Sequence, residues 1–323
     1  MKIKRIALVW LPLVVALFSV AMVTAQNRAP QGPGGFPGGP RGFRGRGPGR
    51  GFRGFMSPPP GFKKHVLLEW ADTRNGIAQH VSTSHALAVI EEMGYNSGAY
   101  FSYIRTDSNI IAYHPKMTTG QPASGGPSLA NVNAIFFMGH REVPIDAQQK
   151  ADLLKFVRDG GGFVAAHVAS TAFMSWPAFG KLLGGRYDGH PWGITNAHLI
   201  VVDPTFPAMK FFPTEFDFHY EFYQIKDFQA ADSRVLMCLD TSGLDMTRRG
   251  VHPADAPYPI TWAKTYGKGR VFYSSLGHPF STWDNAQVRR MWFTAIKWAL
   301  GEINNVNVTP NHISSCTPSA IGH

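Results

Sequence analysis

Short apolar runs alternate with amphipathic stretches through the first half of the chain. Each run has the length of a buried strand, and together they cover residues 64–70, 99–104, 134–138 and 163–166. Between them, residues 81–93 and 146–157 place apolar side chains at helical spacing, and Gly94 predicts the end of the first of these helices. Strands that alternate with helices predict an α/β fold with a mostly parallel sheet covered on both faces.

Beyond residue 185 extended segments dominate, and helical spacing returns only near the C-terminus. The extended segments cover residues 198–203, 220–226, 234–239, 260–264 and 270–274. Residues 266–275 (YGKGRVFYSS) predict a hairpin whose glycines supply the turn. Residues 285–300 predict a helix whose aromatic stripe packs in the core. This pattern fits one domain over residues 63–303, followed by a polar C-terminal tail over 304–323.

The N-terminal segment has the features of an export signal. Three basic residues precede an apolar run over 6–23, and Val23-Thr24-Ala25 is typical of a cleavage site. We therefore predict a signal peptide over residues 1–25, a periplasmic or extracellular location, and no membrane span after cleavage. The alternative is an uncleaved anchor, because the apolar run is almost long enough to cross a bilayer.

Residues 26–62 are rich in Gly, Pro, Arg and Phe and predict a disordered linker, because they cannot bury enough apolar surface to offset the entropy of ordering. Most of the net charge of +10 belongs to the leader and the linker. Residues 61–323 carry 22 basic and 21 acidic side chains, so the domain is almost neutral. We therefore expect no nucleic-acid partner.

The two cysteines, Cys238 and Cys316, allow one disulfide, and the sequence does not show whether it forms.

Four histidines lie just after predicted strands: His80, His140, His167 and His278. His167 follows the apolar strand of GGGFVAAHVAS, where a three-layer α/β fold places its nucleophile elbow. The carboxyl ends of parallel strands share one edge of a sheet, so we expect these residues to converge on one pocket. Imidazole acts there as a general acid or base, or as a metal ligand.

The second half of the chain adds polar candidates, namely His190 in DGHPW and His219, Glu221 and Tyr223 in HYEFY. His219 and Glu221 alternate along an extended segment and therefore face the same side. A surface or structural role is the alternative for each histidine, and it is the favoured role for His140 and for His80 or His190 taken alone. Because no HExxH or CxxC spacing is present, we predict no cofactor, with a divalent metal ion as the alternative.

Four motifs in order resemble the ThuA-like (trehalose utilisation) family: GGGFVAAHVAS, GGRYDGHPW, HYEFY and PITWAKTYGKGRVFYSSLGHPF. The resemblance covers about residues 64–302. It implies a three-layer domain, flavodoxin-like or class I glutamine amidotransferase-like, with a mostly parallel central sheet. The residues that match family positions are His80, His167, His190, Glu221 and His278. The chain departs from the family in WADTRNGIAQH, which replaces an Arg-His turn, and in the residues before Glu221.

Class I glutamine amidotransferases carry a cysteine nucleophile at the elbow and a later His-Pro-Glu. This chain has His167 at the elbow and His278-Pro279-Phe280 at the later position. Without the nucleophile, acyl transfer from glutamine has no covalent step, so we exclude that activity despite the fold.

The resemblance implies work on a small carbohydrate, in particular trehalose-like disaccharides and their 3-keto derivatives. On a 3-keto-glycoside we expect His167 to act as the base and Glu221 to orient it or to protonate the leaving oxygen, with His278 as the third catalytic group. The expected substrate-binding residues are His80, His190, Trp192 and Tyr223. The reaction is then that of a lyase, an isomerase or a hydrolase.

The main alternative is a non-catalytic carbohydrate-binding or scaffold protein at the cell surface. A glycoside hydrolase needs two suitably spaced carboxylates, and only Glu221 is well placed, with Asp188 a weaker second. Among the aromatic residues, Trp176 and Trp283 fit the core better than a sugar site. The sequence does not indicate an oligomeric state.

Overall fold

The computed structural model describes residues 65–74, 79–123, 125–252 and 257–316. The predicted signal peptide and linker lie outside these residues. None of the helices in these four ranges is both long and apolar enough to cross a lipid bilayer.

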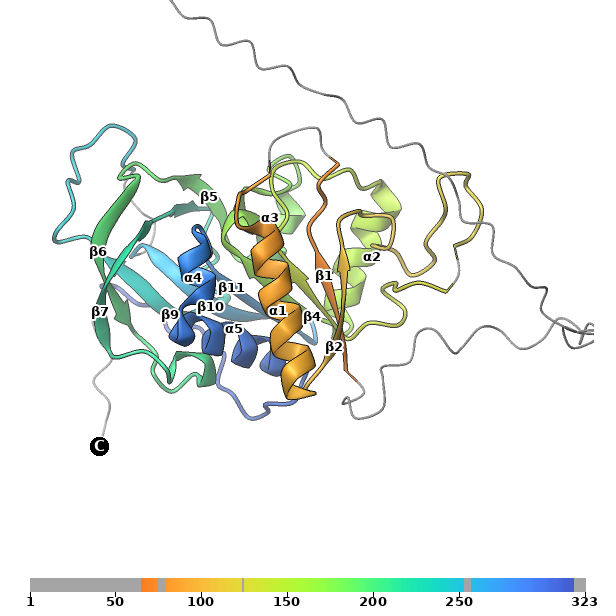
Figure 1. The fold of residues 1–323 in the computed structure, drawn as a ribbon. Coiled ribbons are helices and arrows are strands. Elements are labelled where there is room, and N and C mark those ends of the chain that lie inside the picture. The colour runs from red at the N-terminus through yellow and green to blue at the C-terminus, as the bar shows by residue number, and fades with distance from the viewer. Residues whose placement is uncertain (1–64, 75–78, 124, 253–256, 317–323) are drawn as a thin grey trace, which may run out of the picture. The chain divides into compact units, whose positions relative to one another are not determined.

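In the described residues, nine strands form one sheet in the order β2-β1-β3-β4-β11-β10-β9-β6-β7 (Figure 1). Their bounds are β1 (Val66–Trp70), β2 (Phe101–Arg105), β3 (Ala134–Phe137), β4 (Gly162–Ala166), β6 (Ile194–Val201), β7 (Glu215–Glu221), β9 (Ser233–Asp240), β10 (Pro259–Tyr266) and β11 (Gly269–Ser274). The strands β5 (Arg186–Gly189) and β8 (Gln224–Lys226) form a separate antiparallel pair.

The sheet combines a parallel core with an antiparallel extension. Strands β2, β1, β3, β4 and β11 all pair in parallel, which confirms the α/β class. Strands β10, β9, β6 and β7 continue the sheet through antiparallel pairs, so the sheet as a whole is mixed. The reversal begins at the predicted hairpin, where Gly267 has a φ of 62° in the turn between β10 and β11.

Helices cover both faces of the parallel core. They are α1 (Thr83–Ser97), α2 (Ala147–Arg158), α3 (Pro177–Leu183), α4 (Phe280–Asp284) and α5 (Ala286–Ala299), with the short 3₁₀ helices η1 (His167–Thr171) and η2 (Pro207–Met209). Side chains alternate along β1, so Leu67 packs with α1 and α5, whereas Leu68 packs with α2 and α3 on the other face. The domain therefore has the three predicted layers.

The predicted end of the first helix at Gly94 is wrong. Helix α1 continues to Ser97 and is closed by Gly98, whose φ is 63°. A Cβ atom at Gly94 would lie 2.2 Å from the ring of Tyr100. Gly94 is thus required by the close approach of an aromatic ring, which a local sequence pattern does not contain.

The last described segment is fastened to the antiparallel extension. A disulfide joins Cys238 on β9 to Cys316, with their Cα atoms 5.9 Å apart. Asn311 accepts a hydrogen bond from the Val235 backbone N–H and donates one to its carbonyl. The pairing that the sequence left open is therefore made, and it ties the C-terminal segment to the sheet.

Candidate functional site

His167 lies at a sharp turn where β4 ends and η1 begins. Its φ is 45°, a conformation that costs energy for any residue other than glycine. The Tyr273 hydroxyl donates to the His167 carbonyl over 2.8 Å and so holds the turn. The expected elbow is present, and the His167 side chain is completely buried.

Both ring nitrogens of His167 have close neighbours. Nδ1 lies 2.7 Å from the Ser275 carbonyl oxygen. Nε2 lies 2.8 Å from the Tyr223 hydroxyl, and the two rings stack with centroids 4.5 Å apart. Tyr223 is itself buried and holds His167 in place, and its expected contact with a sugar stays a prediction.

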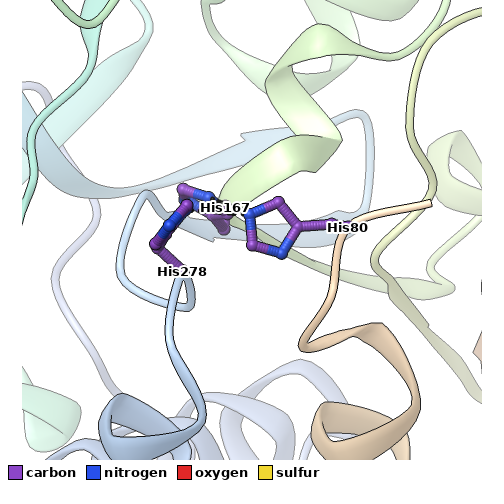
Figure 2. Close-up of side chains that lie close together, drawn as sticks. All are labelled: His80, His167 and His278. Carbon is purple, nitrogen blue, oxygen red and sulfur yellow. Dashed lines mark hydrogen bonds between the residues drawn. The ribbon is translucent and has the colours of Figure 1, made fainter. Parts of the chain in front are cut away.

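His80 and His278 meet His167 from two other segments (Figure 2). His80 precedes α1, and its Nε2 lies 3.2 Å from His167 Nε2 and 2.9 Å from His278 Nδ1. His278 follows β11. One nitrogen from each ring falls within 4.8 Å of the other two, so the three histidines can serve as ligands of a single metal ion. The predicted convergence at the carboxyl edge of the parallel core therefore occurs for these three histidines.

Among the described residues, Glu221 carries the only carboxylate that pairs with this cluster. It ends β7, and its Oε2 lies 3.1 Å from His278 Nδ1 and 3.7 Å from His167 Nε2. Its Oε1 lies 3.7 Å from Nε2 of His190, which is more exposed and marks the mouth of the site. Burial favours protonation of Glu221, but the hydrogen bond and positive charge of His278 outweigh it and hold the pKa of this carboxyl below its ordinary value.

Burial disfavours the charged form of two of the imidazoles, those of His80 and His167. Desolvation, with repulsion from His278, lowers the pKa of His80 to about 4. Desolvation and repulsion from His80 hold the pKa of His167 well below its ordinary value. The site thus combines two neutral imidazoles, those of His80 and His167, with an ionised carboxylate, which is suited to proton transfer and to binding a cation.

Tyr220 is a supporting residue that the sequence analysis did not identify. Its buried hydroxyl accepts hydrogen bonds from the backbone N–H groups of Gly277 and His278, each over 2.6 Å. It donates to the Ser275 carbonyl over 2.6 Å. Alternation along HYEFY was the available signal, since it places Tyr220 on the opposite, inward face of β7 from Glu221.

Several residues expected near the site have other roles. Trp192 is only 5% exposed, packs against Tyr258 and donates to the Asp245 carbonyl, and its stacking on a sugar stays a prediction. His219 is exposed and bonds to Asn196, away from the cluster.

The remaining candidates also lie outside the cluster. Asp188 pairs with Lys226 and His252, so it is not a second free carboxylate. Trp283 is buried and donates to the Gly277 carbonyl. His140 is not among the three clustered histidines.

Tyr187 is a further rim residue that the sequence analysis missed. Its ring meets Tyr223 edge to face at 4.7 Å and lies 5.9 Å from the His190 ring. Burial, together with the charge of Glu221, raises the pKa of Tyr187 to about 12, so its hydroxyl stays protonated. It is the aromatic side chain next to the mouth of the site.

Comparisons with known proteins bear on the family and the fold of the chain. The family model described as "ThuA: Trehalose utilisation" matches residues 66–299. A crystal structure of a ThuA-like protein from Bacteroides uniformis is 20% identical, with a TM-score of 0.59 over 76% of this chain and 95% of that one. A ThuA-like protein from Parabacteroides merdae is 16% identical, with a TM-score of 0.52 over 79% of this chain and 95% of that one. The search of curated proteins found no match.

Proposed function

This chain belongs to the ThuA (trehalose utilisation) family, and from that premise we propose that it acts on sugars through general acid/base chemistry on 3-keto-glycosides or related disaccharides. The observation that carries the proposal is the convergence of three histidines on one ionised carboxylate, Glu221, at the carboxyl edge of the sheet. Such a site can move a proton without a covalent nucleophile.

The proposed reaction is an elimination. A carbonyl at carbon 3 of the sugar acidifies the hydrogen on carbon 2. A base removes this proton, the electron pair forms a double bond between carbons 1 and 2, and the glycosidic oxygen leaves carbon 1. The departing oxygen takes up a proton, so the products are an unsaturated keto sugar and a free alcohol.

The structure supports a division of roles that differs from the sequence-based one. His167 is fully buried, and both of its ring nitrogens are engaged, so it is poorly placed to remove a proton from the substrate. Glu221 is ionised and partly exposed. We therefore assign to Glu221 both removal of the carbon 2 proton and its delivery to the leaving oxygen.

We also propose that the activity is exported, as the leader over residues 1–25 predicts. The Cys238–Cys316 disulfide supports this location, because disulfides persist in oxidising compartments and are rare in the cytosol.

The test is an NMR time course of the purified protein with a 3-keto disaccharide. Glu221→Gln removes the base, and Glu215→Gln at the exposed start of the same strand is the matched control. We expect the rate to fall by about 10²- to 10⁴-fold in Glu221→Gln and to be unchanged in Glu215→Gln. Equal rates in the two variants would refute the assignment. Saturable broadening of the sugar signals without conversion by the wild type would instead indicate a carbohydrate-binding protein.

A further inference from the structure

The nitrogen atoms of His80, His167 and His278 have the spacing of ligands around one metal ion (Figure 2). Metal–nitrogen bonds of about 2.0–2.1 Å place neighbouring ligands about 3.0 Å apart at a right angle and about 3.4 Å apart at the tetrahedral angle. The two contacts that His80 Nε2 makes, 2.9 and 3.2 Å, fall at or close to this range. The rings approach edge to face, which brings their nitrogens together without stacking the rings.

The outer hydrogen bonds of two rings fix where their lone pairs point. His167 Nδ1 faces the Ser275 carbonyl, which only accepts, so the proton is on Nδ1 and the lone pair is on Nε2. Ser82 donates its hydroxyl hydrogen to the Gly277 carbonyl and therefore accepts from His80 Nδ1 over 3.0 Å. The His80 lone pair is then also on Nε2.

His167 Nε2 accepts the Tyr223 hydroxyl hydrogen over 2.8 Å and lies 3.2 Å from His80 Nε2, with no hydrogen between these two nitrogens. His278 Nδ1 lies 2.9 Å from His80 Nε2 and 3.1 Å from Glu221 Oε2, and it must release its hydrogen to bind an ion. The three nitrogens therefore face one space in which a cation can accept their lone pairs. An oxygen acceptor behind each ring is also the arrangement that orients histidines bound to metal ions.

We propose that His80, His167 and His278 bind one divalent first-row metal ion, of which zinc fits best, with Glu221 beside it. Imidazole nitrogens with one carboxylate suit zinc better than magnesium or calcium, which prefer oxygen ligands. The inference rests on the proposed function only for the role of the ion, which is to polarise the substrate carbonyl next to Glu221.

Metal binding can be measured without any sugar. Protein stripped with a chelator is titrated with Zn²⁺ by calorimetry, and its metal content is then determined after dialysis. Co²⁺ serves as a second probe, because its visible d–d bands report the ligands directly. The variants are His80→Gln and His278→Gln, both partly exposed side chains, whose fold is checked by circular dichroism and thermal unfolding.

The matched control is His198→Gln on β6. His198 lies between the carboxylates of Glu215 and Asp217, which form a competing surface cluster. We expect one Zn²⁺ per chain in the wild type and in His198→Gln, and affinity weaker by about 100-fold or more in the two site variants. The Co²⁺ bands should change only in the site variants.

Three results would overturn the inference: no Zn²⁺ binding by the wild type, equal affinity in the wild type and the site variants, or loss of binding in His198→Gln. Turnover of the 3-keto disaccharide by metal-free protein would refute the catalytic role of the ion while leaving the proposed function intact. Tight Zn²⁺ binding without any turnover would support the metal site and refute the proposed function.

Discussion

The hydroxyl of Tyr220 organises the loop that carries His278, and its removal gives the sharpest stability prediction. In Tyr220→Phe the two backbone N–H groups of Gly277 and His278 lose their acceptor, while the ring and its packing are kept. The Ser275 carbonyl is not left alone, because His167 Nδ1 still donates to it. The substitution therefore leaves two buried backbone N–H groups without a hydrogen-bond acceptor.

The magnitude follows from the cost of leaving a buried polar group unsatisfied, which is about 1–3 kcal/mol per group. Two donors give an expected loss of about 2–6 kcal/mol in the free energy of unfolding. The matched control is Tyr100→Phe, whose equally buried hydroxyl makes one hydrogen bond, to the Ile90 carbonyl over 2.7 Å. We expect that variant to lose about 1 kcal/mol.

The assay is urea denaturation of both variants and the wild type, with the disulfide intact, followed by fluorescence and circular dichroism. Coincident transitions and equal m values are required before the midpoints are converted into free energies. If Tyr220→Phe loses no more stability than Tyr100→Phe, the loop does not depend on this hydroxyl and the argument fails.

Three further predictions concern other parts of the chain. Burial, aided by the charge of Glu91, raises the pKa of Glu69 well above 4.5, so its contribution to stability is complete below about pH 4.5 and is lost as the pH rises toward the folded-state pKa. The free energy of unfolding of the wild type should fall by about 1.4 kcal/mol per pH unit in this range, and that of Glu69→Gln, measured by the same urea denaturation, should lack this fall. An equal pH dependence in the two proteins would contradict the prediction. Gly277 has a φ of 152°, and a Cβ there would lie 3.1 Å from the Cβ of His167. Gly277→Ala should therefore lower the melting temperature and weaken Zn²⁺ binding, whereas Gly193→Ala, with open space around its Cβ, should lose only about 1 kcal/mol and keep binding. Cys316→Ser should lose about 2–4 kcal/mol in chemical denaturation, and a wild type unaffected by reductant would show that the disulfide adds nothing.

The fold was most predictable where local pattern and tertiary structure agree. The apolar runs before residue 166 became β1, β2, β3 and β4 within a few residues of their expected bounds. In the second half, sequence pattern located extended segments but not their partners, because strand order depends on contacts distant in sequence. The extended segment expected over 220–226 is in fact the end of β7 and the short strand β8, which belong to different sheets.

The site was predictable where residues follow strands and unpredictable where they act through the backbone. His80, His167 and His278 were expected to converge because parallel strands end at one edge. The Gly-Pro-rich loop around Trp192 suggests an exposed ring, whereas the ring is only 5% exposed and packs against Tyr258. Alternation along HYEFY places Tyr220 on the inward face of β7, but its role was missed because its hydroxyl bonds to main-chain groups distant in sequence.

The identity of the residue at the elbow determines what this site can do. The turn after β4 presents one strained side chain at the carboxyl edge of the sheet, and here that side chain is an imidazole whose Nδ1 is tied to the Ser275 carbonyl. A tied imidazole cannot rotate to attack a substrate, but it presents Nε2 in a fixed direction. The histidines that complete the cluster come from the segments before α1 and after β11, and each is fixed by its own contacts, His80 through Ser82 and His278 through Tyr220. Any chemistry at this edge therefore depends on the relative position of three loops. Substitutions at the residues that hold those loops should impair the site about as much as substitutions of the histidines themselves.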